Sequence, residues 1–129
     1  MIDHLGINCS DLDRSAAFYD AVLGVLGHSR LLDHGVAIGY GTTMPVFWLS
    51  AQPDTGPASG PNREIHVAFT APAAAEVRAF FDTAVAHGAE VLHEPRLWPE
   101  YHEHYFGAFV RDPDGNNVEA VCHTAQPGD

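Results

Sequence analysis

The feature that most constrains the fold of this 129-residue chain is an internal repeat. An offset of 62 residues carries His4 onto His66, and it also carries Ala17-Phe18-Tyr19-Asp20 onto Ala79-Phe80-Phe81-Asp82. A single offset that superposes both a histidine and a helical tetrad indicates two copies of one structural unit. Two such units can lay their sheets edge to edge around one cleft, with their helices packed outside.

Hydrophobic periodicity predicts the same order of elements in both copies, namely a strand, a helix and three further strands. The first copy has a strand over 2–9, a helix over 12–26 and strands near 30–32, 36–40 and 46–50. The second copy has a strand over 64–70, a helix over 72–87 and strands near 90–92, 105–111 and 117–123. We therefore predict an α+β fold of two βαβββ modules, with eight strands in a curved mixed sheet around a metal-binding cleft.

Length and composition indicate one domain that acts on a small molecule. It divides into module 1 (1–51), a linker (52–63), module 2 (64–123) and a tail (124–129). Seventeen acidic residues against six basic ones give a net charge of −11, which argues against nucleic acid and anionic membranes as partners. The chain shows no signal sequence and no apolar membrane span, so a cytoplasmic protein is expected.

Strand alternation predicts a cluster of metal ligands in the cleft. The apolar residues of the first, fifth and last strands alternate and are expected to face the helices. His4, His66 and Glu119 occupy the opposite positions on these strands and therefore face the cleft. Two neutral imidazoles and one carboxylate form the open-sided arrangement that catalytic divalent ions use.

These segments resemble the vicinal oxygen chelate superfamily. The resemblance is carried by Asp3-His4-Leu5, Ile65-His66-Val67-Ala68-Phe69 and the turn Asp112-Pro113-Asp114-Gly115, which Glu119 follows four residues later. The superfamily includes glyoxalase I, extradiol dioxygenases, fosfomycin-resistance thiol transferases, methylmalonyl-CoA epimerase and bleomycin-binding proteins. The resemblance implies a divalent ion, either Fe, Mn, Zn or Ni, held by His4, His66 and Glu119. It also implies a homodimer, in which the site is often shared between subunits.

Departures from the family pattern separate the possible activities. Trp48 stands where glyoxalase I has a fourth ligand, and an indole cannot bind a divalent ion. The fosfomycin enzymes gather Lys and Arg around a phosphonate, whereas this chain has no lysine. The three-ligand shell therefore favours an extradiol-type dioxygenase, although Phe109 replaces the tyrosine that those enzymes carry ten residues before the final glutamate.

Several residues are expected to act on the substrate. Glu119, His104 and Tyr105 are the candidate catalytic residues. His104 lies in the His-rich segment 101–105, which could supply an acid or base, and Tyr105 shares strand parity with Phe109 and could therefore reach the cleft. A largely apolar pocket for a flat, oxygen-chelating substrate is expected to be lined by Trp48, Ser50, Phe109 and Val121.

Two alternative functions follow from the same resemblance. A glyoxalase I-like lyase or isomerase would recruit its fourth ligand from His102, Glu103 or His104. A bleomycin-resistance-type protein would bind a drug without metal or turnover. The charge of −11 suits a cationic drug, whereas the retained ligand triad argues against this binding function.

Overall fold

The computed structural model describes residues 1–51 and 64–129, and these form the two predicted modules. The first module contains β1 (Leu5–Cys9), α1 (Leu12–Val25), β2 (Ser29–Asp33), β3 (Ala37–Gly41) and β4 (Pro45–Ala51). The second contains β5 (His66–Thr70), α2 (Ala74–Ala86), β6 (Val91–Leu97), β7 (Phe106–Arg111) and β8 (Asn117–Cys122). The prediction of an α+β fold with two βαβββ modules is confirmed. The predicted linker 52–63 lies outside the described residues.

Each module builds its own four-stranded sheet, so the eight strands are divided between two sheets that are not closed into a barrel. The first sheet has the order β1-β4-β3-β2 and the second has the order β5-β8-β7-β6. β1 runs parallel to β4 and β5 runs parallel to β8, whereas the other neighbours are antiparallel. This order places β5 directly beside β8, which carry the predicted ligands His66 and Glu119.

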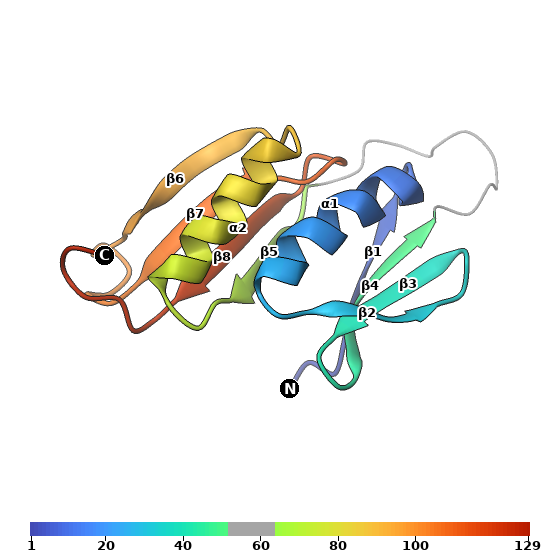
Figure 1. Cartoon of the computed structure of the whole chain (residues 1–129), viewed down its shortest axis with the longest axis horizontal. Coiled ribbons are helices and arrows are strands. Elements are labelled where there is room, and N and C mark those ends of the chain that lie inside the picture. The colour runs from blue at the N-terminus through green and yellow to red at the C-terminus, as the bar shows by residue number, and fades with distance from the viewer. Residues whose placement is uncertain (52–63) are drawn as a thin grey trace.

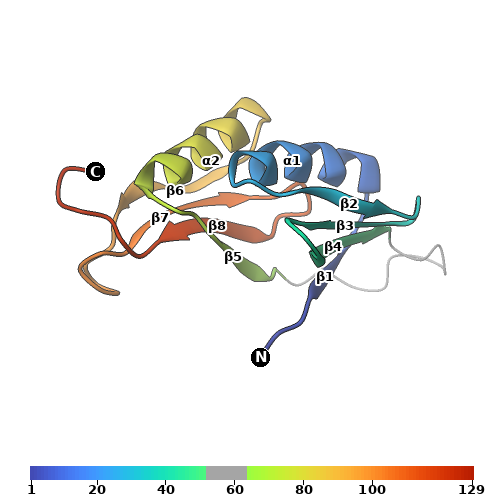
Figure 2. The same ribbon diagram turned by 60° about the horizontal axis from the view of Figure 1, so that its bottom comes forward.

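Both helices cover the same side of the sheets (Figures 1 and 2), and they pack against each other. α1 begins at Asp11, whose side chain accepts a hydrogen bond from the backbone N–H of Arg14. Both helices are followed by a glycine with positive φ, Gly27 at 88° and Gly88 at 82°. Within residues 1–51 and 64–129, the other side of each sheet carries no helix, and this side is called the open face below. None of the helices in the described part of the chain is both long and apolar enough to cross a membrane.

The two modules are joined by a polar cluster at the Asp-Pro-Asp-Gly turn. Tyr19 in α1 is fully buried, and its ring lies 6.5 Å from that of Phe69 in β5. The Tyr19 hydroxyl donates a hydrogen bond of 2.7 Å to Asp112. Asp114 accepts hydrogen bonds from the backbone N–H and the hydroxyl of Ser10, at 3.1 and 2.6 Å. The turn in module 2 therefore also holds the start of α1 in module 1.

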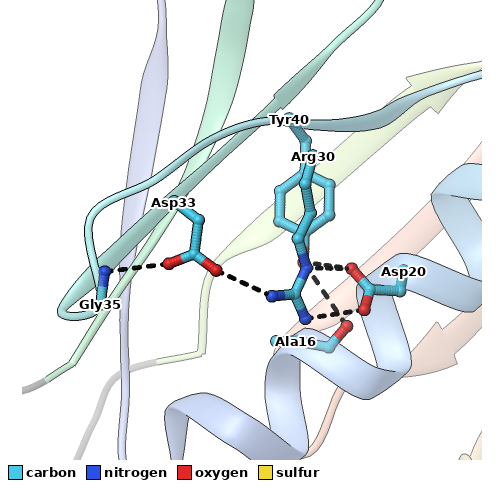
Figure 3. A network of polar contacts seen from close by, with 6 residues as sticks. All are labelled: Ala16, Asp20, Arg30, Asp33, Gly35 and Tyr40. Atoms are coloured by element: carbon cyan, nitrogen blue, oxygen red, sulfur yellow. Dashed lines mark hydrogen bonds and ion pairs between the residues drawn. The ribbon is translucent and has the colours of Figure 1, made fainter.

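A second polar network fixes α1 to the first sheet (Figure 3). The Arg30 guanidinium donates to both carboxylate oxygens of Asp20, at 2.8 and 2.7 Å, and to Asp33 at 3.2 Å. The buried Tyr40 hydroxyl donates to Asp20 at 2.8 Å. Burial raises the pKa of Asp20, but the hydrogen bonds from Arg30 and Tyr40 outweigh it, so the pKa lies below its usual value. This network orders the helix side of module 1, away from the predicted ligands.

Candidate functional site

Glu119 is a buried carboxylate on the open face of the second sheet. Its neighbours Val118 and Ala120 belong to the apolar core, so alternation along β8 directs Glu119 to the opposite face. Glu119 is only 1% exposed, and it pairs in register with Ala68 of β5 and Phe109 of β7. A buried carboxylate is costly unless it accepts hydrogen bonds or binds a cation, so its contacts define what the site can do.

Two side chains satisfy the Glu119 carboxylate. His66 Nε2 lies 2.9 Å from Glu119 Oε2, and the Tyr105 hydroxyl donates a hydrogen bond to Oε1. Burial and the hydrogen bond to Glu119 together raise the pKa of Tyr105 well above its ordinary range, so the phenol stays protonated and remains a donor. The His66 side chain is 51% exposed, which leaves the pair accessible from the open face. The structure thus brings together two predicted ligands and one predicted catalytic residue.

His4, the third predicted ligand, lies apart from this pair. It precedes β1, its Nδ1 is 2.6 Å from Asp3 Oδ1, and its side chain is 59% exposed. With Trp48 and Ser50 it lines an open hollow of about 610 Å³ on the first module. Within residues 1–51 and 64–129, no three His, Cys, Asp or Glu side chains converge so as to hold an ion. One chain therefore assembles two of the three predicted ligands.

The predicted substrate-binding residues are divided between the same two surfaces. Trp48 and Ser50 accompany His4, and the Trp48 ring stacks on His34 with centroids 6.1 Å apart. Phe109 and Val121 lie on the second sheet and are each 6% exposed. The predicted site residues thus lie on two separate surfaces, one on the open face of each module.

His104, the other predicted catalytic residue, does not contact the His66–Glu119 pair. Its Nδ1 lies 2.9 Å from the carbonyl oxygen of Ala125, and its Nε2 lies 3.3 Å from Glu103. The neighbouring His102 forms a 2.8 Å hydrogen bond with His123. Of the His-rich segment, only Tyr105 makes a hydrogen bond to Glu119 within the described residues.

Sequence reasoning missed His93, which lies beside Phe109 together with Trp98. The His93 ring lies 5.5 Å from the Phe109 ring, and the Trp98 ring lies 5.2 Å from it. Both residues belong to β6 or follow it directly, and β6 extends through Pro95. Proline argues against a strand in sequence reasoning, so the alternation that would have placed His93 beside Phe109 was not visible.

A buried carboxylate paired with an imidazole thus lies on the open face of a two-module βαβββ fold. The model of the Glyoxalase/Bleomycin resistance protein/Dioxygenase superfamily matches residues 1–120. The chain belongs to this superfamily.

Solved structures agree with this assignment. A glyoxalase/bleomycin resistance protein from Albidiferax ferrireducens is 27% identical, with a TM-score of 0.79 over 92% of this chain and 95% of that one. A glyoxalase-related enzyme from Fulvimarina pelagi is 25% identical, with a TM-score of 0.69 over 94% and 86% of the two chains. Lactoylglutathione lyase from Agrobacterium tumefaciens is also 25% identical, with a TM-score of 0.66 over 94% and 92%. A comparison with curated proteins finds no match.

Proposed function

We propose that this protein is a homodimeric, divalent-metal enzyme whose site is shared between subunits. His66 and Glu119 of one subunit hold the ion together with His4 of the partner subunit. The observation that carries the proposal is the buried Glu119 carboxylate in contact with His66 on the open face of the second sheet. The separate position of His4 supports a site that needs a second chain.

The donors that are present suit such an ion. An imidazole nitrogen and a carboxylate oxygen are ligands of Fe, Mn, Zn and Ni alike. The Tyr105 hydroxyl holds Glu119 Oε1, so Oε2 and the His66 nitrogen are left facing each other at 2.9 Å. Tyr105 therefore orients the carboxylate, as residues that support metal ligands generally do. The bound ion supplies Lewis acidity to neighbouring oxygens of the substrate.

The surface of module 1 that carries His4 would supply the wall of the pocket opposite Glu119. Trp48 and Ser50 line the same hollow as His4, so a subunit that brings His4 to the ion brings these residues as well. Phe109 and Val121 contribute apolar surface beside Glu119. Such a pocket suits a small aromatic or carbonyl-containing substrate with one chelating end.

The reaction that we favour is an extradiol-type cleavage with O2 as the oxidant. Trp48 stands in place of the carboxylate or amide that supports proton transfer in glyoxalase I and the epimerase. A glyoxalase-like lyase is the second candidate, and the likeness to the Agrobacterium lyase supports it. Both cysteines, Cys9 and Cys122, are free and buried, which suits the reducing cytoplasm that we propose as its location.

The experiment is elemental analysis of untagged protein purified without oxygen. We expect about one ion per chain in the wild type and none in Glu119→Gln, because the amide is a weaker ligand than the carboxylate. Glu94→Gln, which changes an exposed glutamate of β6, is the matched control and should keep its metal. Iron or manganese would direct the next assay to oxygenase activity, whereas nickel or zinc would direct it to lyase activity. Stoichiometric metal in Glu119→Gln, or a wild type that stays metal-free after reconstitution, would contradict the proposal and favour drug binding.

A further inference from the structure

A second pocket lies on the helix side of the sheets, where the two modules meet. Its volume is about 390 Å³, which is within the range of small-molecule sites in proteins. Its walls come from α1 in module 1 and, in module 2, from the end of α2 and the turn between β7 and β8 (Figure 1). Among the described residues, its lining includes no predicted metal ligand and no predicted substrate-binding residue. The pocket is therefore separate from the site proposed above.

The walls of this pocket are held in place before any ligand binds. Asp112 Oδ2 accepts hydrogen bonds from the Tyr19 hydroxyl at 2.7 Å and from the Asn116 side chain at 3.0 Å. Its Oδ1 accepts from two backbone N–H groups at 2.9 Å each. Gly88 follows α2 with a φ of 82°, which fixes the direction of the chain there. A pocket whose walls are already ordered loses less free energy to ordering when a ligand binds.

Two guanidinium groups line the pocket, in a chain that has six arginines and no lysine. Arg111 Nη1 donates to Glu64 Oε1 and to the carbonyl oxygen of Gly115, at 2.6 Å each. Its Nε lies 3.4 Å from Glu90 Oε2, so the charge of Arg111 is already compensated. Arg14 is exposed, and among the described residues no oxygen accepts a hydrogen bond from its guanidinium. Arg14 therefore offers an uncompensated positive charge to a ligand.

The rest of the lining favours one size and charge of ligand. Its apolar part consists of Ala17, Phe18, Ala89 and Pro113. Glu90 lines the same pocket and the chain has a net charge of −11, so a singly charged anion meets less repulsion than a phosphate dianion. A guanidinium binds a carboxylate through two parallel hydrogen bonds. The lining thus suits a molecule with one carboxylate and an apolar body.

We propose that this pocket is a second ligand site, which binds a small monocarboxylate with an aromatic or aliphatic body. The carboxylate accepts hydrogen bonds from the Arg14 guanidinium, and the apolar body contacts Ala17 of α1 and Pro113 of the turn. Because these residues belong to different modules, the ligand stabilises the junction between them. The site needs neither the metal nor the second chain of the proposed function.

The test compares two probes of the same shape, 3-phenylpropanoate and its neutral amide, by NMR titration of the protein as purified. Wild type is expected to bind the carboxylate at least about tenfold more tightly than the amide. The backbone amide signals of Ala17 and Ala89 should shift and so locate the probe. Arg14→Gln should lower the preference for the carboxylate below about twofold. Arg78→Gln, which changes an exposed arginine of α2 outside the pocket, is the matched control and should keep the preference.

A second variant tests the cavity rather than the charge. Ala17→Leu places a larger side chain in the pocket from an exposed position of α1, where leucine favours the helix, so it should weaken the binding of both probes at least about tenfold. Glu119→Gln should bind both probes as the wild type does, whatever its metal content.

Three results would overturn the inference and leave the proposed function standing. They are equal affinity for both probes in wild type, an undiminished preference in Arg14→Gln, and signal shifts confined to β5 and β8. A wild type that stays metal-free while both probes bind as expected would instead contradict the proposed function alone.

Discussion

The substitution Tyr19→Phe tests the polar contact that joins the two modules. Tyr19 is fully buried, and its hydroxyl donates to Asp112 Oδ2 at 2.7 Å. Asp112 is itself only 5% exposed, so solvent cannot replace the lost donor. Phenylalanine keeps the ring and its packing, and the variant therefore removes this hydrogen bond alone.

The size of the effect follows from the remaining partners of Asp112. A hydrogen bond to a charged group contributes about 1.5–3 kcal/mol. After the substitution Asp112 Oδ2 still accepts from the side chain of Asn116 at 3.0 Å, and Oδ1 keeps two backbone donors at 2.9 Å each. Because the carboxylate stays partly satisfied, we expect the lower part of that range, about 1.5–2 kcal/mol, or a decrease in Tm of roughly 5 °C.

Urea unfolding followed by circular dichroism measures this loss. Tyr101→Phe is the matched control, because Tyr101 is 59% exposed and stacks on Trp98 with centroids 5.7 Å apart. Its free energy of unfolding should change by less than about 0.5 kcal/mol. A change of that small size in Tyr19→Phe would refute the reasoning, because the hydroxyl would then not be a buried partner of Asp112.

Two further predictions concern tyrosine ionisation and the backbone at the site. Burial and nearby carboxylates raise the pKa of Tyr19, Tyr40 and Tyr105, so above pH of about 10 the unfolded chain binds fewer protons than the folded one. In urea unfolding, the free energy of unfolding should keep its full value below that pH and fall steeply above it, while phenolate absorbance rises as the chain unfolds. A free energy of unfolding that stays flat up to pH of about 11 would contradict this prediction. Gly107→Ala places a Cβ 3.1 Å from Glu119 Oε1 and 3.2 Å from Tyr105 Cε1. Metal affinity by titration should fall at least about tenfold in a folded protein, and an unchanged affinity would count against Tyr105 as the residue that orients Glu119.

The order of elements could be predicted from the sequence because local signals agree with the fold. Asp11 caps α1, and Gly27 and Gly88 follow the two helices with positive φ. The second strand of module 2 was predicted too short, near 90–92, because Pro95 interrupts its pattern. β6 is an edge strand whose pairing with β7 shifts register on both sides of His93, and such strands tolerate proline.

The site could be predicted in part. Strand parity placed His66 and Glu119 on one face, because their strands are neighbours in one sheet. The alternation of residues along a strand gives no information on how the two modules are oriented relative to each other. The separation of His4 from this pair was therefore not predictable. Tyr105 was expected to reach the cleft from its parity with Phe109, and it contacts Glu119. His104 instead bonds to the backbone of Ala125, a contact that depends on how the C-terminal segment folds back.

The central claim is that one metal site needs residues from two chains, and mixed dimers test it most directly. His4→Ala and Glu119→Ala are each expected to bind no metal when pure. If the subunits are unfolded, mixed in equal amounts and refolded, about half of the dimers carry one chain of each kind. Each mixed dimer then contains one intact site, formed by His66 and Glu119 of one chain and His4 of the partner subunit. The account predicts about one ion per four chains in the mixture, and a mixture as free of metal as its two components would contradict it.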